Sequence, residues 1–380
     1  MSRVALVKCR EYDLEQVTQA LVRALEPLGG LGQFVKPGQR VLLKINMLRP
    51  TPPETATTTH PVVAVALARM VRDLGAVPVI GDSCGGAKAY GQSERALEEC
   101  GIAPLAREHG IETIVFETAG VERVKVENAA FLHEIVVSKA VLDADVVISV
   151  PKLKTHVETL ITGAVKNMFG VMPGAYKLNL HRRAPGPVNL GHALLDIYKT
   201  VKPALCVMDG ILAMEGSGPS WGKPKFVGAL LASADGVALD HTAARLVGQD
   251  PTQVTTIAPA KERGIGENDT AAIEVVGDSI DELRPADFAL TSNAVMRAAP
   301  NFLLNILNNH FFWVRPRWNQ SGCELAGECE KVCPVDAITI ANNRVTIDKK
   351  TCIQCTACYM VCPNDGILLK KSIIAKILSA

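Results

Sequence analysis

The sequence predicts an α/β protein with a mostly parallel sheet that helices cover on both faces, followed by a small, cysteine-rich α+β region. Residues 1–300 alternate short apolar runs with helix-periodic segments. The apolar runs lack polar alternation, as expected for parallel strands buried on both faces. Seven of the 11 cysteines then lie between Cys323 and Cys362. We therefore divide the chain into an α/β domain (1–300), a linker (301–316), a cysteine-rich region (317–371) and a tail (372–380).

The strands expected in the α/β domain are short apolar runs. In chain order they are Val4–Lys8, Arg40–Ile45, Val77–Gly81, Thr113–Phe116, Ala144–Val150, Leu205–Met208 and Ala229–Ala232. Apolar residues at three-to-four spacing predict helices at Leu14–Leu28, which Gly29-Gly30 would end, and at Pro61–Leu74. We expect helical segments after each of the last two strands as well.

Charge and composition exclude several classes of partner. The chain has 40 Lys and Arg against 39 Asp and Glu, so no bulk field attracts nucleic acid or an anionic membrane. There is no apolar run of the roughly 18 residues that a membrane helix needs, and residues 1–9 lack the apolar segment of a signal peptide. We expect a cytoplasmic protein without nucleic-acid or membrane partners, in which clustered thiols bind metal rather than form disulfides.

The cysteine spacing identifies that metal. The last four cysteines form C-x2-C-x2-C-x3-C-P with Cys352, Cys355, Cys358, Cys362 and Pro363. This is the bacterial iron–sulfur spacing, in which three thiolates bind one cluster and the fourth binds the other. A zinc ribbon would use two separated cysteine pairs. A region of about fifty residues is also too small for a sufficient core without such a staple. We predict a bacterial-ferredoxin-like α+β domain.

An internal repeat supports two clusters. Residues 333–338 (CPVDAI) recur 29 residues later as 362–367 (CPNDGI). Between them, Thr339–Ala341 and Arg344–Ile347 flank Asn342-Asn343, which predicts a β-hairpin.

The first cysteine run lacks one ligand. At offsets 0, 3, 6 and 10 it has Cys323, Ala326, Cys329 and Cys333, where the second run has cysteine throughout. By the crossover rule, one [4Fe–4S] cluster is bound by Cys333, Cys352, Cys355 and Cys358. The second cluster, [4Fe–4S] or [3Fe–4S], keeps Cys323, Cys329 and Cys362.

Three arrangements of the three-cysteine cluster stay open. It can lose one iron and become [3Fe–4S]. Its fourth iron can be bound by water, substrate or a carboxylate such as Glu324 or Glu328. Alternatively, a cysteine of the α/β domain can reach it, from among Cys9, Cys84, Cys100 and Cys206. The protein would then be either a plain electron carrier or one with an iron that binds substrate as a Lewis acid.

Polar side chains follow the predicted strands, where open α/β sheets bind their ligands. Lys44 and Asp82 stand at two strand ends. The candidate catalytic residues follow later strands: Lys152, Lys154, His156, Lys166, Asp209 and Asp235. The lysines suit a carboxylate or phosphate, and histidine can transfer protons near neutral pH. The sequence lacks a P-loop, a strand-linked GxGxxG and a GxSxG elbow, so neither a nucleotide hydrolase nor a nicotinamide dehydrogenase is supported.

In combination, several segments resemble the domain of unknown function 362 family, whose members often carry a C-terminal ferredoxin module. The segments are 44–46 (KIN), 81–83 (GDS), 151–156 (PKLKTH), 163–167 (GAVKN), 209–218 (DGILAMEGSG) and 234–240 (ADGVALD). The resemblance implies iron–sulfur binding and a single enzyme-like domain, without an agreed reaction.

Three functions remain. The first is an oxidoreductase that passes low-potential electrons from its clusters to a small anionic substrate. A redox partner of the ferredoxin or flavodoxin type would supply the electrons. The second is a carrier or adaptor without its own substrate, and the third is a non-redox lyase that uses an open iron. Residues 317–371 carry seven Lys and Arg and six Asp and Glu, which predicts no strong single-sign field there and favours docking on the protein's own α/β domain.

Overall fold

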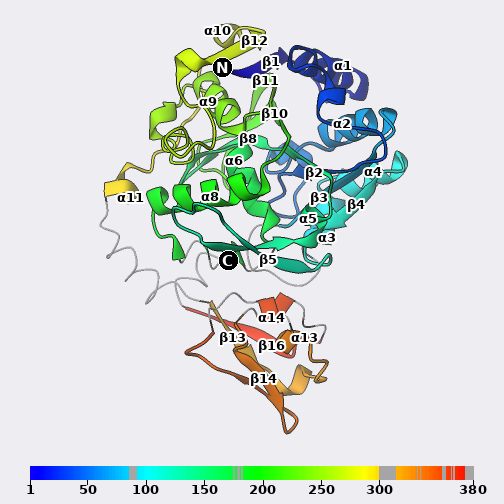
Figure 1. Ribbon diagram of the computed structural model, residues 1–380, viewed down its shortest axis with the longest axis vertical. Coiled ribbons are helices and arrows are strands. Elements are labelled where there is room, and N and C mark those ends of the chain that lie inside the picture. The colour runs from blue at the N-terminus through cyan, green and yellow to red at the C-terminus, as the bar shows by residue number, and fades with distance from the viewer. Residues whose placement is uncertain are drawn as a thin grey trace.

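The computed structural model describes residues 1–84, 92–173, 176–177, 180, 183–298, 314–331, 333, 335–352, 357–360, 362 and 364–372. Figure 1 shows an α/β domain and a small separate body that follows it in the chain. The α/β domain has a mixed, mostly parallel sheet with helices on both faces, so the predicted fold class is confirmed. Within the described residues, no helix has the length and apolar character needed to cross a membrane.

The main sheet has the strand order β12-β1-β11-β10-β7-β2-β3-β4, with β8 paired to β10 and to β9. Its strands are β1 (Ser2–Lys8), β2 (Arg40–Ile45), β3 (Val77–Asp82), β4 (Glu112–Val115), β7 (Val146–Val150), β8 (Lys152–His156), β9 (Leu160–Thr162), β10 (Leu205–Glu215), β11 (Lys223–Ser233) and β12 (Ile273–Gly277). Strands β7, β2, β3 and β4 are parallel neighbours. The short strands β5 (Val121–Lys125) and β6 (Glu134–Ser138) pair separately. All seven predicted strands are present.

The helix expected after Leu205–Met208 is wrong. Strand β10 continues to Glu215 and pairs antiparallel with β11, from Cys206 opposite Ser233 to Glu215 opposite Lys223. The backbone groups of residues 209–215 therefore bond across a long hairpin, and this long-range pairing overrides the local helical pattern. One consequence is that Asp209 lies within a strand instead of in a loop.

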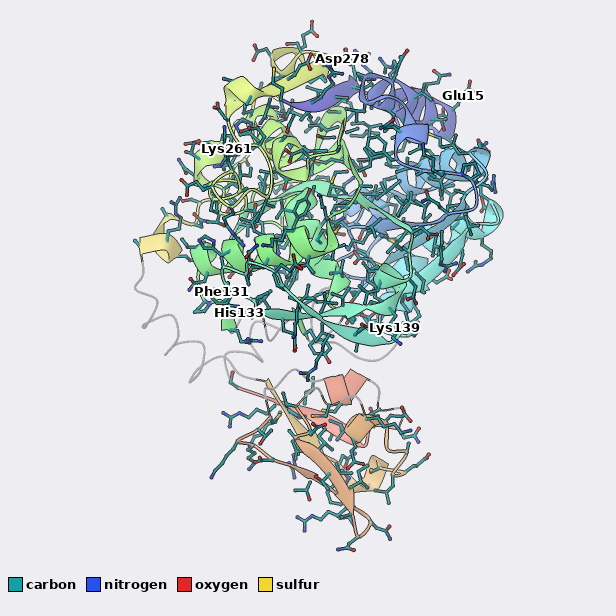
Figure 2. All side chains as sticks on the ribbon, viewed as in Figure 1. Glu15, Phe131, His133, Lys139, Lys261 and Asp278 are labelled. Atoms are coloured by element: carbon teal, nitrogen blue, oxygen red, sulfur yellow. The ribbon has the colours of Figure 1, made fainter. Side chains whose placement is uncertain are left out.

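Helices cover both faces of the sheet. On one face pack α1 (Leu14–Leu25), α2 (Pro61–Asp73), α3 (Gln92–Glu99) and α4 (Ile102–Glu108), and on the other α6 (Ala164–Asn167), α8 (Pro187–Val201) and α9 (Gly236–Leu246). The shorter helices are α5 (Lys139–Leu142), α10 (Ile280–Leu283) and α11 (Ala294–Ala298). Strand β2 shows the alternation, because Val41 and Leu43 belong to the first core while Leu42 belongs to the second. Charged side chains such as Glu15 and Asp278 lie at the periphery (Figure 2).

The ferredoxin-like region is built from two small antiparallel pairs. Strand β13 (Val314–Trp318) pairs with β16 (Ile367–Lys371), and β14 (Ile338–Ala341) pairs with β15 (Arg344–Ile347). The second pair is the predicted hairpin, and its turn residues Asn342 and Asn343 have φ angles of 49° and 56°. Such left-handed pairs are typical of two-residue hairpin turns. The short helices α13 (Glu328–Lys331) and α14 (Ala357–Met360) complete the region, which includes the last residues of the predicted linker.

Candidate functional site

A cavity of about 250 Å³ opens beside the carboxyl ends of β2 and β3. Four lysines line it, Lys44, Lys154, Lys166 and Lys177, together with His156. Asp82 is the one carboxylate among the described lining residues. We call this site the lysine cavity. Its excess of positive groups over negative ones suits an anionic ligand.

Lys44 and Asp82 form a buried ion pair at one wall of the lysine cavity. Lys44 Nζ lies 2.7 Å from Asp82 Oδ1, and each side chain is 1% exposed. Lys44 Nζ also donates to the carbonyl oxygen of Ile45 and to Asn167 Oδ1. A Cβ atom on Gly170 would lie 2.3 Å from both charged groups, so any larger residue there would displace the pair. Burial lowers the pKa of Lys44 to about 8.

Lys154 and His156 reach the lysine cavity from β8. Residues 152, 154 and 156 share one face of this strand, and Leu153 packs into the core on the other. Lys154 Nζ donates to the carbonyl oxygen of Thr57 at 2.7 Å. No carboxylate in the described part of the chain forms an ion pair with it. Burial first, and the nearby positive lysines second, lower the pKa of Lys154 well below its ordinary value.

The imidazole of His156 is held in one orientation. Its Nδ1 accepts hydrogen bonds from the backbone N–H groups of Glu158, at 3.1 Å, and Thr159, at 3.3 Å. A ring nitrogen that accepts cannot carry the proton of the neutral ring, so that proton resides on Nε2. His156 is therefore suited to donate a hydrogen bond from Nε2.

Lys166 and Lys177 complete the positive lining. Lys177 Nζ donates to the carbonyl oxygens of Ser83 and Cys84, and burial lowers its pKa. Lys166 Nζ lies 5.1 Å from the ring centre of Phe169, and burial lowers its pKa to about 8. The sequence did not single out Lys177, because it follows no predicted strand and belongs to no motif. A lysine in an otherwise apolar stretch was the one available signal.

Three of the six predicted site residues lie outside the lining of the lysine cavity. Lys152 and Asp209 form a fully buried ion pair of 2.7 Å, which Tyr12 bridges through its hydroxyl group. Asp235 caps helix α9, accepting from the N–H groups of residues 237 and 238. The structure thus brings Lys154, His156 and Lys166 together in the lysine cavity. The other three have structural roles outside its lining, in an ion pair and in a helix cap.

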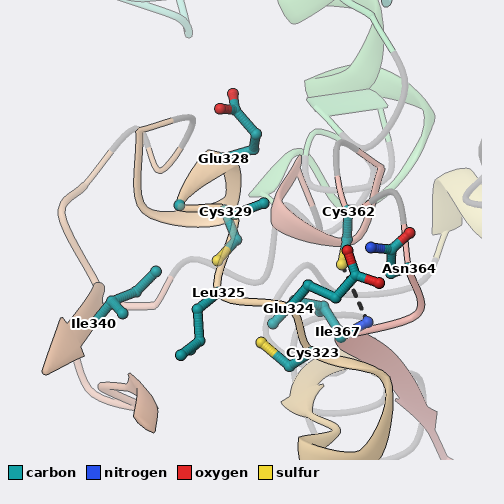
Figure 3. A pocket seen from close by; sticks show the side chains of 12 residues that line it. Cys323, Glu324, Leu325, Glu328, Cys329, Ile340, Cys362, Asn364 and Ile367 are labelled. Atoms are coloured by element: carbon teal, nitrogen blue, oxygen red, sulfur yellow. Dashed lines mark hydrogen bonds between the residues drawn. The ribbon is translucent and has the colours of Figure 1, made fainter. Parts of the chain in front are cut away.

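In the ferredoxin-like region, the three cysteines of the incomplete run meet at one small pocket. Cys323, Cys329 and Cys362 line it, and Ala326 is part of the same wall. Figure 3 shows the three thiol groups directed into a shared space. No described group of three ligand side chains is close enough for a single metal ion, but cubane thiolates bind separate irons and stand further apart. We call this site the three-cysteine pocket.

The two halves of the repeat have the same local geometry. The N–H of Ala337 donates to Cys333 Sγ at 3.2 Å, and the N–H of Gly366 donates to Cys362 Sγ at 3.1 Å. Asp336 and Asp365 have matching φ angles of 51° and 53°. Hydrogen bonds to the sulfurs are one of the features that tune iron–sulfur clusters. The residues present therefore fit cluster binding.

Most candidates for a fourth ligand are excluded by position. Figure 3 shows the carboxylate of Glu328 directed away from the three thiols, and it pairs with Lys331 at 2.9 Å. Glu324 lines the pocket and remains a candidate. The four cysteines of the α/β domain are buried in its core: Cys9, Cys84, Cys100 and Cys206.

The predicted ligands of the complete cluster are described in part. Cys333 and Cys358 belong to the small core of the region, and Cys352 is half-buried. Cys355 lies outside the described residues.

The cluster assignment predicts unequal effects of cysteine removal. Cys329→Ala should lower the iron content by about one cluster and leave the other in place. Cys355→Ala should remove the complete cluster and unfold the region, because cluster binding there is folding energy. Iron and sulfide analysis of anaerobically prepared protein measures both effects. Equal loss of all iron in the two variants would count against the crossover assignment.

Fold and cysteines together define an iron–sulfur protein with an α/β domain and a ferredoxin-like domain. Residues 41–245 match the family described as Domain of unknown function (DUF362). A thylakoid-associated protein of Synechocystis sp. is 40% identical over 270 residues, which cover 71% of this chain and 81% of that protein. The chain belongs to the DUF362 family. Residues 315–365 match a 4Fe-4S dicluster domain, so the C-terminal cysteines are those of an iron–sulfur domain.

Two ferredoxins resemble this domain alone. A ferredoxin of Alicyclobacillus acidocaldarius is 46% identical over 44 residues, covering 12% of this chain and 56% of that protein. A ferredoxin named 7Fe, from Hydrogenibacillus schlegelii, is 46% identical over 39 residues, covering 10% of this chain and 50% of that protein. Among solved structures, the lactate racemase apoprotein of Thermoanaerobacterium thermosaccharolyticum aligns with a TM-score of 0.41 and 14% identity, covering 63% of this chain and 55% of that one.

Proposed function

We propose that this protein is an oxidoreductase that delivers low-potential electrons from its ferredoxin domain to a small anionic substrate in the lysine cavity. The observation that carries the proposal is the convergence of four buried lysines on a cavity of about 250 Å³. Burying positive groups is costly unless they are compensated, and Asp82 compensates only one of them directly. A carboxylate or phosphate would supply the missing negative charge.

The residues of the lysine cavity would have separate roles in binding the substrate, positioning it and donating a proton. Lys154, Lys166 and Lys177 would bind the acidic group of the substrate, in a site where low dielectric strengthens each charge-assisted hydrogen bond. The Lys44–Asp82 pair would fix the wall against which the substrate lies. His156 would offer its Nε2 proton to the reacting part of the substrate. The clusters, when bound, supply the electrons.

We propose a redox protein of the ferredoxin or flavodoxin type as electron donor, and a cytoplasmic location. We further expect the three-cysteine cluster to lie nearer the lysine cavity than the complete cluster does. The name of the 7Fe ferredoxin supports a seven-iron pair of clusters, [4Fe–4S] with [3Fe–4S].

A second candidate is a non-redox lyase. It is favoured by the three-cysteine pocket, where Ala326 occupies the place of a fourth ligand. An iron without a protein ligand would act there as a Lewis acid.

Re-oxidation of reduced clusters tests the first proposal. Anaerobic protein is photoreduced and mixed with a panel of di- and tricarboxylates and phosphate esters, while cluster absorbance and products are followed. A substrate should re-oxidise the clusters in wild type and fail to do so in Lys177→Met. Binding of an anion without re-oxidation would favour the lyase, which a substrate-dependent change in the EPR signal of the three-cysteine cluster would identify. If no anion binds the lysine cavity, the adaptor function stands instead.

Anion binding should weaken as the pH rises through about 8. Burial lowers the pKa of the anion-binding Lys166 to about 8, and it lowers the pKa of Lys44, in the wall beside the anion, to about 8 as well, so each loses its proton well below the ordinary pH for lysine. The anion prefers the protonated form, and its dissociation constant should rise about tenfold per pH unit for each lysine that must take up a proton. Titration calorimetry between pH 6.5 and about 9.5 measures this. A constant affinity across that range would contradict a role for these lysines.

A further inference from the structure

The ferredoxin domain has a basic groove on the side of the complete cluster. The groove has a volume of about 670 Å³ and is lined by residues of β13, β15 and β16 and by Cys352. Five cationic side chains line it, all of them exposed: Arg315, Arg317, Arg344, Lys349 and Lys370. No Asp or Glu is among the described lining residues. Asp348, next to Lys349, accepts hydrogen bonds from the backbone of residues 350 and 351.

Most acidic side chains of the domain lie outside the lining of the groove. Glu324 and Glu328 line the three-cysteine pocket. Glu330 accepts a hydrogen bond from the N–H of Ile340, and Asp336 and Asp365 lie in the two equivalent turns. The near-equal count of charges in residues 317–371 therefore conceals a local excess of positive charge at the groove, whose described lining contains five cations and no carboxylate. The sequence expectation of no strong single-sign field concerned the summed charge of the region, whereas the charged residues that line the groove are all cations.

We propose that the basic groove is the docking surface for an acidic electron-carrier protein of the ferredoxin or flavodoxin class, which delivers electrons to the complete cluster. This rests on the electron-delivery part of the proposed function and adds the surface at which electrons enter the protein. Cys352, a predicted ligand of that cluster, lines the groove, so a protein docked there lies next to a cluster ligand. Electron transfer weakens steeply with distance, so a redox partner gains from a position beside a cluster ligand.

The composition of the groove also fits such a partner. Trp318 and Ile347 are half-buried and offer an apolar centre among the exposed cations. An apolar or aromatic centre with a charged rim is typical of transient protein interfaces. Opposite charge on the two surfaces mainly raises the association rate, which is what a carrier that must leave after each electron requires.

Stopped-flow reduction of the full-length, cluster-loaded protein by a reduced acidic flavodoxin tests the proposal. The charge-reversal variant combines Arg317→Glu with Lys349→Glu, two exposed positions of the groove. Lys331→Glu is the matched control, because Lys331 is an exposed cation of the same domain outside the groove. At low ionic strength the double variant should react about 10- to 100-fold more slowly than wild type, and the control should change about twofold or less. High salt should remove most of the difference.

Equal rates in wild type and the double variant would overturn the proposal. So would binding of the groove to vesicles of phosphatidylglycerol, lost in the double variant while the flavodoxin rate stays unchanged, because the groove would then be a membrane surface. Photoreduction with a deazaflavin bypasses docking and should load both proteins with electrons equally. If no anionic substrate is turned over even after photoreduction, the proposed activity fails, while the flavodoxin rates still decide the docking surface.

Discussion

Replacing Lys154 with methionine is expected to weaken anion binding in the lysine cavity by about 10- to 100-fold without lowering the free energy of unfolding. A hydrogen bond to a charged group contributes about 1.5–3 kcal/mol, which corresponds to that loss of affinity. Lys154 is 1% exposed, and its described hydrogen bond goes to a neutral carbonyl group. The methionine side chain is similar in length to lysine but carries no charge. Losing the cost of burying a charge should offset the lost hydrogen bond to Thr57, so the folded state should be as stable as before or more stable.

Lys152→Met is the matched comparison. Lys152 is two residues away on the same face of β8 and equally buried, but it pairs with Asp209 at 2.7 Å. Its removal leaves an uncompensated buried carboxylate, which should lower the free energy of unfolding by about 3–5 kcal/mol. Denaturant unfolding and titration calorimetry separate the two variants, with exposed Lys139→Met as a neutral reference. Similar destabilisation by both buried substitutions, with unchanged anion affinity, would show that Lys154 is a structural residue like Lys152.

The parts of the fold that the sequence predicted are those set by local pattern. Arg40–Ile45 was predicted with the bounds of β2, because a strand buried on both faces is apolar along its whole length apart from its ends. The hairpin at Asn342-Asn343 followed from turn chemistry, since few residues adopt two successive left-handed conformations. The two cysteine runs predicted the three-cysteine pocket, because their local spacing identifies the cluster type and the crossover rule then joins Cys362 to Cys323 and Cys329.

The parts that could not be predicted depend on distant contacts. Residues 152–156 were expected to follow a strand, but they form β8 because β10 and β9 supply partners from other parts of the chain. Asp209 was assigned to the predicted site because it follows the predicted strand Leu205–Met208. In the structure it lies inside the longer strand β10 and pairs with Lys152. Lys177 reaches the cavity through tertiary packing alone. The excess of cations at the basic groove could not be predicted, because a charge count does not say where the charges lie in the fold.

Replacing Ala326 with cysteine is expected to convert the three-thiolate site into a four-thiolate cluster. Ala326 occupies the offset of a ligand and lines the same pocket as Cys323, Cys329 and Cys362. Leu325 and Gly327 on either side have φ angles of 57° and 83°, so the chain makes a tight turn there. This turn places residue 326 in the lining of the three-cysteine pocket. If the wild-type cluster is [3Fe–4S], iron content should rise from about seven to about eight per chain. The EPR signal of the oxidised three-iron cluster should disappear.

The same variant tests whether the iron that lacks a cysteine ligand binds substrate. If an open iron binds substrate, Ala326→Cys keeps its iron and loses turnover, since the fourth thiolate occupies the position that substrate needs. If the site only carries electrons, turnover continues at a rate set by the altered cluster potential, and flavodoxin reduction through the basic groove stays unchanged. Ala341→Cys, an exposed position in β14 of the same domain, controls for the added thiol and should leave iron content and EPR as in wild type. Identical iron content and EPR in Ala326→Cys and Ala341→Cys would show that residue 326 does not face the cluster, and the assignment of Ala326 to the position of the missing ligand would be wrong.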